Sequence, residues 1–285
     1  MFDSICVCGA GTMGSGIAQT IAQSGFKTLL FDVNQEVLSK AKTNIYKSLN
    51  GLVAKNKISS DQHNQIVNNL FFINNIEDAK AHLIIEAIIE KLDAKVKLFT
   101  QLSKINSPET VFASNTSSLS ITQIQKAIQH PERVLGLHFF NPATVMKLVE
   151  VVKGEYTSEQ TISNADAFCK LINKVPVICK DAPGFIVNRV ARHYYLESLK
   201  SLENNIASKE AIDNILEASG FRLGPFKLMD LIGMDINLAV TEHLYETSNR
   251  AERFKPSPIQ QQLVAEGKLG KKTGEGFYKY NEQSN

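Results

Sequence analysis

The sequence contains no run of about 18 apolar residues, the length that a membrane-spanning helix requires, and its apolar stretch at residues 83–89 is interrupted by Glu86. An excess of one charge is also missing, because 31 Lys and Arg residues stand against 29 Asp and Glu residues, and no dense basic stripe occurs. We therefore predict that the protein neither crosses a membrane nor binds nucleic acid. A hydrophobic content of 43% excludes a disordered chain.

Cysteine is scarce, with four residues in 285. Cys6 and Cys8 have a spacing that some metal sites use, but no nearby His or second Cys pair completes such a site. Both alternate with apolar residues, as residues of a buried strand do, so we expect them in the core and expect no metal. Together with Cys169 and Cys179, they are typical of a protein with reduced thiols.

A targeting signal is not apparent in the first residues. They pass directly into a strand pattern, with neither the basic nor the apolar region of a signal peptide and with no room for a transit peptide. This pattern predicts a cytoplasmic protein.

What the sequence does contain is an alternation of strand and helix patterns over its first 180 residues. Short apolar stretches predict strands at residues 4–8, 27–31, 70–73, 82–87, 111–114, 134–138, 148–152 and 175–179. Helical spacing of apolar residues, with Asn34 as one N-cap, predicts helices at about residues 13–22, 35–55, 60–69, 91–105 and 119–128. This alternation predicts an α/β fold of the Rossmann type, with a mostly parallel sheet and helices on both faces.

The pattern changes near residue 181, at the sequence Asp181-Ala182-Pro183-Gly184. Beyond it, helices are predicted at residues 187–202, 209–218, 226–245 and 259–267, and only residues 277–280 suggest a strand. Single hydrophobic cores stop growing at roughly 250–300 residues. We therefore expect a Rossmann-type domain at residues 1–180 and a helical domain at residues 181–285.

A glycine-rich turn, Gly9-Ala10-Gly11-Thr12-Met13-Gly14, follows the first predicted strand and opens the first helix. Its glycines permit a tight turn, close approach of the backbone to a pyrophosphate, and close packing of helix on sheet. The N–H groups at the helix N-terminus favour phosphate binding. Asp32 ends the second strand 18 residues after Gly14 and would accept hydrogen bonds from the adenosine ribose, which favours NAD over NADP. The alternative is a structural turn with a helix-capping Asp.

A histidine and a glutamate lie in two consecutive apolar strands. His138 ends its strand at the carboxyl edge, where open α/β sheets bind ligands. Glu150 follows 12 residues later within an otherwise apolar strand, where an acid is costly without a partner. A turn between the strands would let Glu150 fix the imidazole tautomer and stabilise its charged form when His138 takes a proton. The alternative is a buried His beside a strand-edge Glu that faces solvent.

Polar residues also follow the strand at residues 111–113, again at a carboxyl end. The segment Ser114-Asn115-Thr116-Ser117-Ser118 offers hydroxyls and an amide that can orient a substrate oxygen. Ser and Thr before a helix are equally good N-caps. Asn188, on the first helix of the second domain, is either a cleft residue or a surface Asn.

Five segments extend these motifs over the whole chain: residues 113–119 (ASNTSSL), 136–142 (GLHFFNP), 147–151 (KLVEV), 181–189 (DAPGFIVNR) and 270–278 (GKKTGEGFY). Together they resemble the L-3-hydroxyacyl-CoA dehydrogenase family. The chain length is similar to that of the stand-alone bacterial type, often called 3-hydroxybutyryl-CoA dehydrogenase.

This resemblance implies roles for individual residues. His138 would be the catalytic base, Glu150 its partner, and Ser117 and Asn188 the contacts to the substrate oxygen. Beyond the glycine turn and Asp32, the implied cofactor contacts are Glu90, Lys95, Asn115, Ser117, Asn141 and Lys272. Ser48 and Lys55 lie on the segment where the family binds the phosphate end of coenzyme A.

The implied activity is the reversible, NAD-dependent oxidation of an L-3-hydroxyacyl-CoA, with 3-hydroxybutyryl-CoA as the expected short-chain substrate. The family also implies a homodimer formed through the helical domain. The apolar residues Leu228, Leu231, Ile232 and Leu238 fit such an interface and fit an internal core equally well. Two alternatives remain open: a dehydrogenase of a 3-hydroxy acid or sugar acid without coenzyme A, and a non-catalytic NAD(H)-binding redox sensor.

Overall fold

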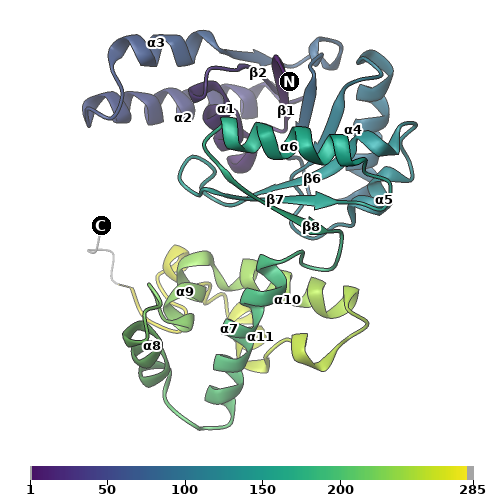
Figure 1. Cartoon of the computed structure of the whole chain (residues 1–285). Helices are drawn as coiled ribbons and strands as arrows, with labels where there is room; N and C mark the ends of the chain where they lie inside the picture. The colour runs from purple at the N-terminus through teal and green to yellow at the C-terminus, as the bar shows by residue number, and fades with distance from the viewer. Residues whose placement is uncertain (1, 281–285) are drawn as a thin grey trace. The chain divides into compact units, whose positions relative to one another are not determined.

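The computed structural model describes residues 2–280 and divides into two units, Met1–Ala182 and Pro183–Asn285 (Figure 1). The first unit holds an eight-stranded sheet, and the second is built from helices. Within residues 2–280, no helix is both long enough and apolar enough to span a membrane. The cytoplasmic location suggested by the sequence stays a prediction.

The sheet of the first unit contains the strands β1 (Ser4–Cys8), β2 (Lys27–Phe31), β3 (Leu70–Ile73), β4 (Leu83–Glu86), β5 (Val111–Ser114), β6 (Val134–Phe139), β7 (Leu148–Lys153) and β8 (Val175–Lys180). Their order across the sheet is β3-β2-β1-β4-β5-β6-β7-β8. All neighbours are parallel except β6 and β7, so that β7 and β8 run opposite to the other strands. The predicted mostly parallel sheet is confirmed.

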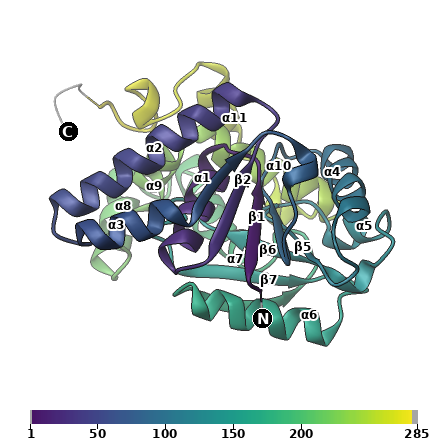
Figure 2. The same ribbon diagram turned by 90° about the horizontal axis from the view of Figure 1, so that it is seen from above.

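Helices cover both faces of this sheet. They are α1 (Thr12–Gln23), α2 (Gln35–Ala54), α3 (Ser60–Asn68), α4 (Leu92–Ile105), α5 (Ile121–Gln125) and α6 (Glu159–Leu171). On one face, Ile5 of β1 packs in one apolar cluster with Ile17 of α1 and Phe168 of α6. On the other face, the ring of Phe112 in β5 lies 5.3 Å from the ring of Phe99 in α4. Figure 2 shows α2 and α3 at one end of the sheet and α4 and α5 at the other.

Helix α6 is absent from the expectations of the sequence analysis. It begins after Ser158, whose hydroxyl accepts a hydrogen bond from the backbone N–H of Thr161. Its buried residues Ile162, Ala165 and Phe168 do follow helical spacing. The signal is therefore present, but this apolar face is narrow and lies among polar residues, so the pattern is weak.

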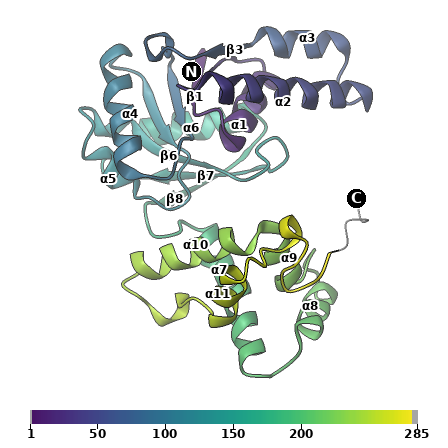
Figure 3. The same ribbon diagram turned by 180° about the vertical axis from the view of Figure 1, so that it is seen from behind.

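The second unit contains α7 (Val187–Glu203), α8 (Lys209–Ala218), α9 (Pro225–Ile232), α10 (Met234–Thr247) and α11 (Pro258–Ala265), and Figure 3 shows α8 beside α9. The prediction of one helix over residues 226–245 is wrong. The chain separates into α9 and α10 at Gly233, whose φ of +104° lies in a region that glycine adopts readily and other residues rarely do. Because this conformation is not helical, the helix cannot continue through Gly233.

The strand suggested at residues 277–280 is also wrong, because within residues 2–280 this segment makes only an isolated bridge, between Glu275 and Lys279. The carboxylate of Asp230 instead accepts hydrogen bonds from the backbone N–H groups of Phe277 and Tyr278, both at 2.9 Å, and from the Tyr280 hydroxyl at 3.0 Å. A buried side chain thus takes the place of a neighbouring strand as hydrogen-bond acceptor.

Gly276 packs so closely against Asp230 that a side chain there has no room. A Cβ atom at Gly276 would lie 2.1 Å from Oδ1 of Asp230 and 2.7 Å from Cα of Gly270. We predict that Gly276→Ala lowers the free energy of unfolding by about 1–3 kcal/mol, because overpacking forces its neighbours to move. Urea or thermal unfolding of the full chain measures this change.

Gly51→Ala is the matched control. Apart from Gly51, its two chain neighbours and the adjacent backbone of α2, no heavy atom of the described residues lies within 4 Å of a Cβ at this position. Alanine in a helix interior is favoured over glycine by roughly 0.5–1 kcal/mol, so this variant should be as stable as the parent chain or more stable. Equal stability of Gly276→Ala and Gly51→Ala would contradict the packing described here.

Candidate active site

The glycine turn between β1 and α1 is tightly constrained by its surroundings. Gly9 has a φ of +102°, and a Cβ atom there would lie 2.6 Å from the carbonyl oxygen of Ala87. A Cβ atom at Gly14 would lie 1.8 Å from the carbonyl oxygen of Gly9. At Gly11, by contrast, no heavy atom of residues 2–280 outside Ala10, Gly11 and Thr12 lies within 4 Å of the Cβ position. Gly9 and Gly14 thus allow close packing of the backbone, whereas Gly11 leaves open space beside the turn.

The same turn has the properties of an anion site. Helix α1 begins at Thr12, and its N-cap residue Gly11 has no side chain with which to bind the first backbone N–H groups. Such groups at a helix N-terminus carry partial positive charge and bind phosphate oxygens. The space beside Gly11 therefore fits a pyrophosphate.

Asp32 lies directly after β2 and is fixed against the glycine turn. Its Oδ2 accepts a hydrogen bond from the backbone N–H of Ala10 at 2.8 Å, and its Oδ1 accepts one from the N–H of Asn34 at 2.9 Å. Asn34 is the N-cap of α2, as the sequence predicts. A carboxylate held beside a phosphate-binding turn suits the hydroxyls of a ribose and disfavours a 2′-phosphate.

His138 and Glu150 form a pair across two strands. They are direct partners in the antiparallel register of β6 and β7, and Nδ1 of His138 lies 2.6 Å from Oε2 of Glu150. His138 is 6% exposed and Glu150 is 1% exposed. In this dry setting the carboxylate favours a proton on Nδ1 and stabilises a charged imidazole. The strands thus bring together the two side chains that the sequence predicted as a pair.

Two neighbouring contacts hold the strand end that carries His138. Oδ1 of Asn115, in the loop after β5, accepts a hydrogen bond from the backbone N–H of Phe139 at 2.8 Å. Nζ of Lys174 donates to the carbonyl oxygens of Ala143 and Met146 at 2.5 and 2.7 Å, within the loop between β6 and β7. Burial lowers the pKa of Lys174. These bonds fix the backbone on both sides of the turn between the two strands.

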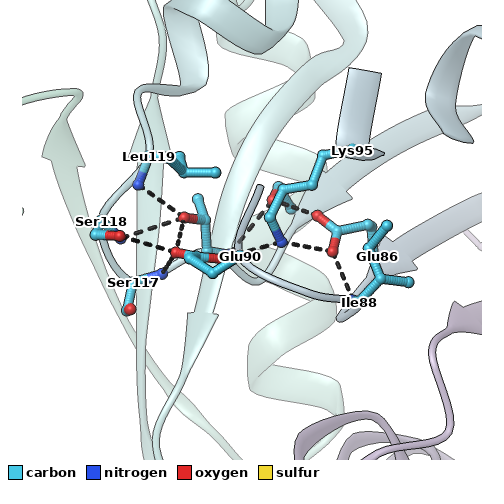
Figure 4. Close-up of polar contacts among 9 residues, drawn as sticks. Glu86, Ile88, Glu90, Lys95, Ser117, Ser118 and Leu119 are labelled. Atoms are coloured by element: carbon cyan, nitrogen blue, oxygen red, sulfur yellow. Dashed lines mark hydrogen bonds and ion pairs between the residues drawn. The ribbon is translucent and has the colours of Figure 1, made fainter. Parts of the chain in front are cut away.

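A second group of charges lies at the ends of β4 and β5 (Figure 4). Nζ of Lys95 in α4 lies 2.6 Å from Oε1 of Glu86 and 3.1 Å from Oε2 of Glu90. Glu90 also accepts hydrogen bonds from the hydroxyl of Ser118 at 2.9 Å and from the backbone N–H of Ser117 at 3.1 Å. Glu90, Lys95 and the Ser117 loop therefore form one cluster.

Glu86 is a member of this cluster that was not among the predicted site residues. Its side chain is fully buried and is an acid within an apolar strand, which is the same signal that singled out Glu150. A buried acid needs a partner, and this requirement could have suggested the pairing with Lys95.

Other predicted site residues are placed as follows. Ser48 of α2 and Lys55, which directly follows this helix, line a groove of about 450 Å³, together with Asn44, Lys47, Gly51 and Leu52. Asn141 is exposed just after β6. Asn188 is the second residue of α7, and Nζ of Lys272 lies 2.5 Å from Oδ1 of Asp235; both residues belong to the second unit. Within residues 2–280, no group of three or more His, Cys, Asp or Glu side chains could hold a metal ion.

Comparison with protein families assigns both units of the chain. Residues 4–182 match the family model for the NAD binding domain of 3-hydroxyacyl-CoA dehydrogenase, and residues 184–280 match the model for the C-terminal domain of the same enzyme. The chain therefore belongs to the 3-hydroxyacyl-CoA dehydrogenase family, and the resemblance stated from its motifs is confirmed.

Individual relatives extend over nearly the whole chain. The 3-hydroxyadipyl-CoA dehydrogenase of Escherichia coli is 45% identical over 277 residues, which cover 96% of this chain but only 58% of that protein. The mitochondrial hydroxyacyl-coenzyme A dehydrogenase of Sus scrofa is 43% identical, with 97% of this chain and 90% of that protein covered. The crystal structure of (S)-3-hydroxybutyryl-CoA dehydrogenase from Ralstonia eutropha gives a TM-score of 0.95 at 35% identity and covers 99% and 100% of the two chains.

Family membership makes the chain an oxidoreductase that uses NAD. The glycine turn and Asp32 fit this cofactor, because they offer a phosphate site and a ribose acceptor side by side. The predicted cofactor and enzyme class are confirmed.

We predict that Asp32→Asn lowers the preference for NAD over NADP about tenfold or more. The amide keeps the size of the side chain but removes the charge that repels a 2′-phosphate. The ratio of the two dissociation constants measures the preference, with the exposed-site variant Asp78→Asn as control. An unchanged ratio would place the discriminating group elsewhere.

Proposed function

We propose that the chain catalyses the reversible oxidation of an L-3-hydroxyacyl-CoA to the 3-ketoacyl-CoA, with NAD reduced to NADH and with 3-hydroxybutyryl-CoA as a substrate. The single observation that carries this proposal is the buried bond of 2.6 Å between Nδ1 of His138 and Oε2 of Glu150. The pair lies in the same sheet as the dinucleotide turn, and family membership supports the substrate class.

His138 is proposed as the general base. With Nδ1 bonded to Glu150, Nε2 is the nitrogen that would take the proton of the substrate hydroxyl. Bound NAD supplies the acceptor for the hydride that leaves carbon 3. As the imidazole becomes positive, the Glu150 carboxylate stabilises it, and the proton returns from Nε2 when the reaction runs in reverse.

The remaining roles concern orientation of the substrate. We assign Ser117 and Asn188 as contacts to the reacting oxygen, as the family resemblance implies. The groove at Ser48 and Lys55 would bind the phosphate end of coenzyme A, because Lys47 also lines it and two ammonium groups suit phosphate. Nε2 of Gln19 donates to the Ser48 hydroxyl at 3.1 Å and so fixes one wall of this groove.

A homodimer is proposed through the helical unit. Of the four apolar residues singled out in the sequence, Leu238 is buried in the unit itself, whereas Leu231 and Ile232 are exposed. Ile236, which lies in α10 beyond Gly233, is exposed as well. A second copy of the chain would cover these three side chains.

The first test is activity on matched substrates. We expect acetoacetyl-CoA with NADH to be turned over, followed at about 340 nm where the reduced nicotinamide absorbs, and free acetoacetate to react far more slowly. A kcat/KM series from C4 to C16 then gives the chain-length preference. Turnover of free 3-hydroxy acids alone would favour a dehydrogenase without coenzyme A, and NADH binding without any turnover would favour a redox sensor.

The second test addresses the base. His138→Ala should lower kcat by about 10²–10⁴-fold, the usual contribution of general acid–base catalysis. Glu150→Gln should keep the fold but lose rate, because the amide preserves the shape and removes the charge. His130→Ala is the matched control, since His130 also lies near a glutamate, with 3.3 Å to Glu132, but is exposed. Near-normal turnover in His138→Ala would refute the assigned role.

A further inference from the structure

The order of strands indicates where the two halves of NAD lie. Asp32 follows β2, the glycine turn follows β1, and β4 and β5 continue the sheet on the other side of β1. With the adenosine ribose at Asp32 and the pyrophosphate at the glycine turn, the nicotinamide half extends toward the carboxyl ends of β4 and β5. The close approach of Gly9 to Ala87 shows that the turn and the end of β4 are in contact.

The carboxyl ends of β4 and β5 carry the charge cluster of Glu86, Lys95 and Glu90. Glu86 is 0% exposed, and its Oε1 accepts hydrogen bonds from Nζ of Lys95 at 2.6 Å and from the backbone N–H of Ile88 at 2.7 Å. Its Oε2 accepts one from the hydroxyl of Ser114 at 2.6 Å. Three hydrogen bonds, one of them from the Lys95 ammonium group, therefore satisfy both oxygens of this buried carboxylate.

Glu90 is the more exposed carboxylate of the cluster, with 39% of its side chain accessible. Oε1 accepts hydrogen bonds from the hydroxyls of Thr116 and Ser118 at 2.5 and 2.9 Å. Burial by itself would raise the pKa of Glu90, but the charge of Lys95 and these hydroxyl bonds outweigh it and lower the pKa. Glu90 is thus ionised at neutral pH.

Two carboxylates share one ammonium group, so the cluster carries a net charge of −1 beside the expected nicotinamide position. The nicotinamide ring is positive in NAD⁺ and neutral in NADH. A fixed negative charge therefore interacts favourably with only one redox state of the cofactor.

We propose that the Glu86–Lys95–Glu90 cluster makes the cofactor site discriminate between redox states, binding NAD⁺ more tightly relative to NADH than a neutral cluster would. Glu86 is a positioning residue in this arrangement. It is fully buried, so it acts on the ring through the charge of the cluster and through the placement of Lys95, and not by contact. The inference rests on the NAD site and not on the proposed acyl-CoA substrate.

The test compares the affinities of the two cofactor forms in the full chain without any acyl-CoA. NADH is titrated by its own fluorescence, and NAD⁺ is titrated by displacement of NADH. In Glu86→Gln the amide oxygen can still accept from Lys95 and Ile88, and the amide nitrogen can donate to Ser114, so the hydrogen bonds persist while the cluster becomes neutral. We expect the ratio Kd(NAD⁺)/Kd(NADH) to rise by about three- to tenfold.

Two controls separate charge from structure. Ser114→Ala removes one hydrogen bond to Glu86 without changing the charge of the cluster. Asp93→Asn removes an exposed charge from α4, the helix that carries Lys95. In both variants the ratio Kd(NAD⁺)/Kd(NADH) should stay within about twofold of the parent value. A purely structural role would weaken both cofactor forms together and leave the ratio unchanged. An unchanged ratio in Glu86→Gln would overturn the proposal.

If Glu86→Gln does not fold, a second variant tests the same proposal. Glu90→Gln neutralises the same cluster at its exposed carboxylate, where substitution is better tolerated. The proposal then requires the same rise in the ratio, and an unchanged ratio in this variant would overturn it as well.

Discussion

The antiparallel pairing of β6 with β7 places His138 and Glu150 directly opposite each other in the buried sheet. All other neighbouring strands of this sheet are parallel. Because antiparallel strands can be joined by a short turn, two residues only 12 positions apart in the sequence become cross-strand partners. Asn115 and Lys174 fix the backbone at the two ends of the connecting turn, so the pair is positioned before any ligand binds.

The other buried acid at this edge of the sheet, Glu86, is also paired. Glu86 lies in β4 as Glu150 lies in β7, each within an apolar strand, and the two acids pair with Lys95 and His138, respectively. An unpartnered buried carboxylate would become protonated or destabilise the fold. The carboxyl edge therefore carries charged groups beside the proposed position of a cofactor whose own charge changes during the reaction.

Sequence periodicity predicted most strands and helices of the first unit, because their apolar faces are wide and their caps strong, as at Asn34. The predictions failed where one residue determines the local structure. The positive φ of Gly233 divides one expected helix into two. The Asp230 side chain accepts hydrogen bonds from Phe277 and Tyr278 in place of a neighbouring strand. The pairing of His138 with Glu150 was predictable because the two residues lie in consecutive strands joined by one turn. Glu86 and Lys95 come from different elements, a strand and the following helix, so their contact depends on how α4 packs.

We propose that Glu150 holds the proton of the neutral His138 imidazole on Nδ1, so that Nε2 acts as the base. The ¹⁵N chemical shifts of the His138 ring, followed by NMR through its titration, measure the tautomer directly. We expect a neutral ring protonated on Nδ1, with that preference weakened in Glu150→Gln. A neutral ring protonated on Nε2, or a tautomer unaffected by Glu150→Gln, would refute this role of Glu150.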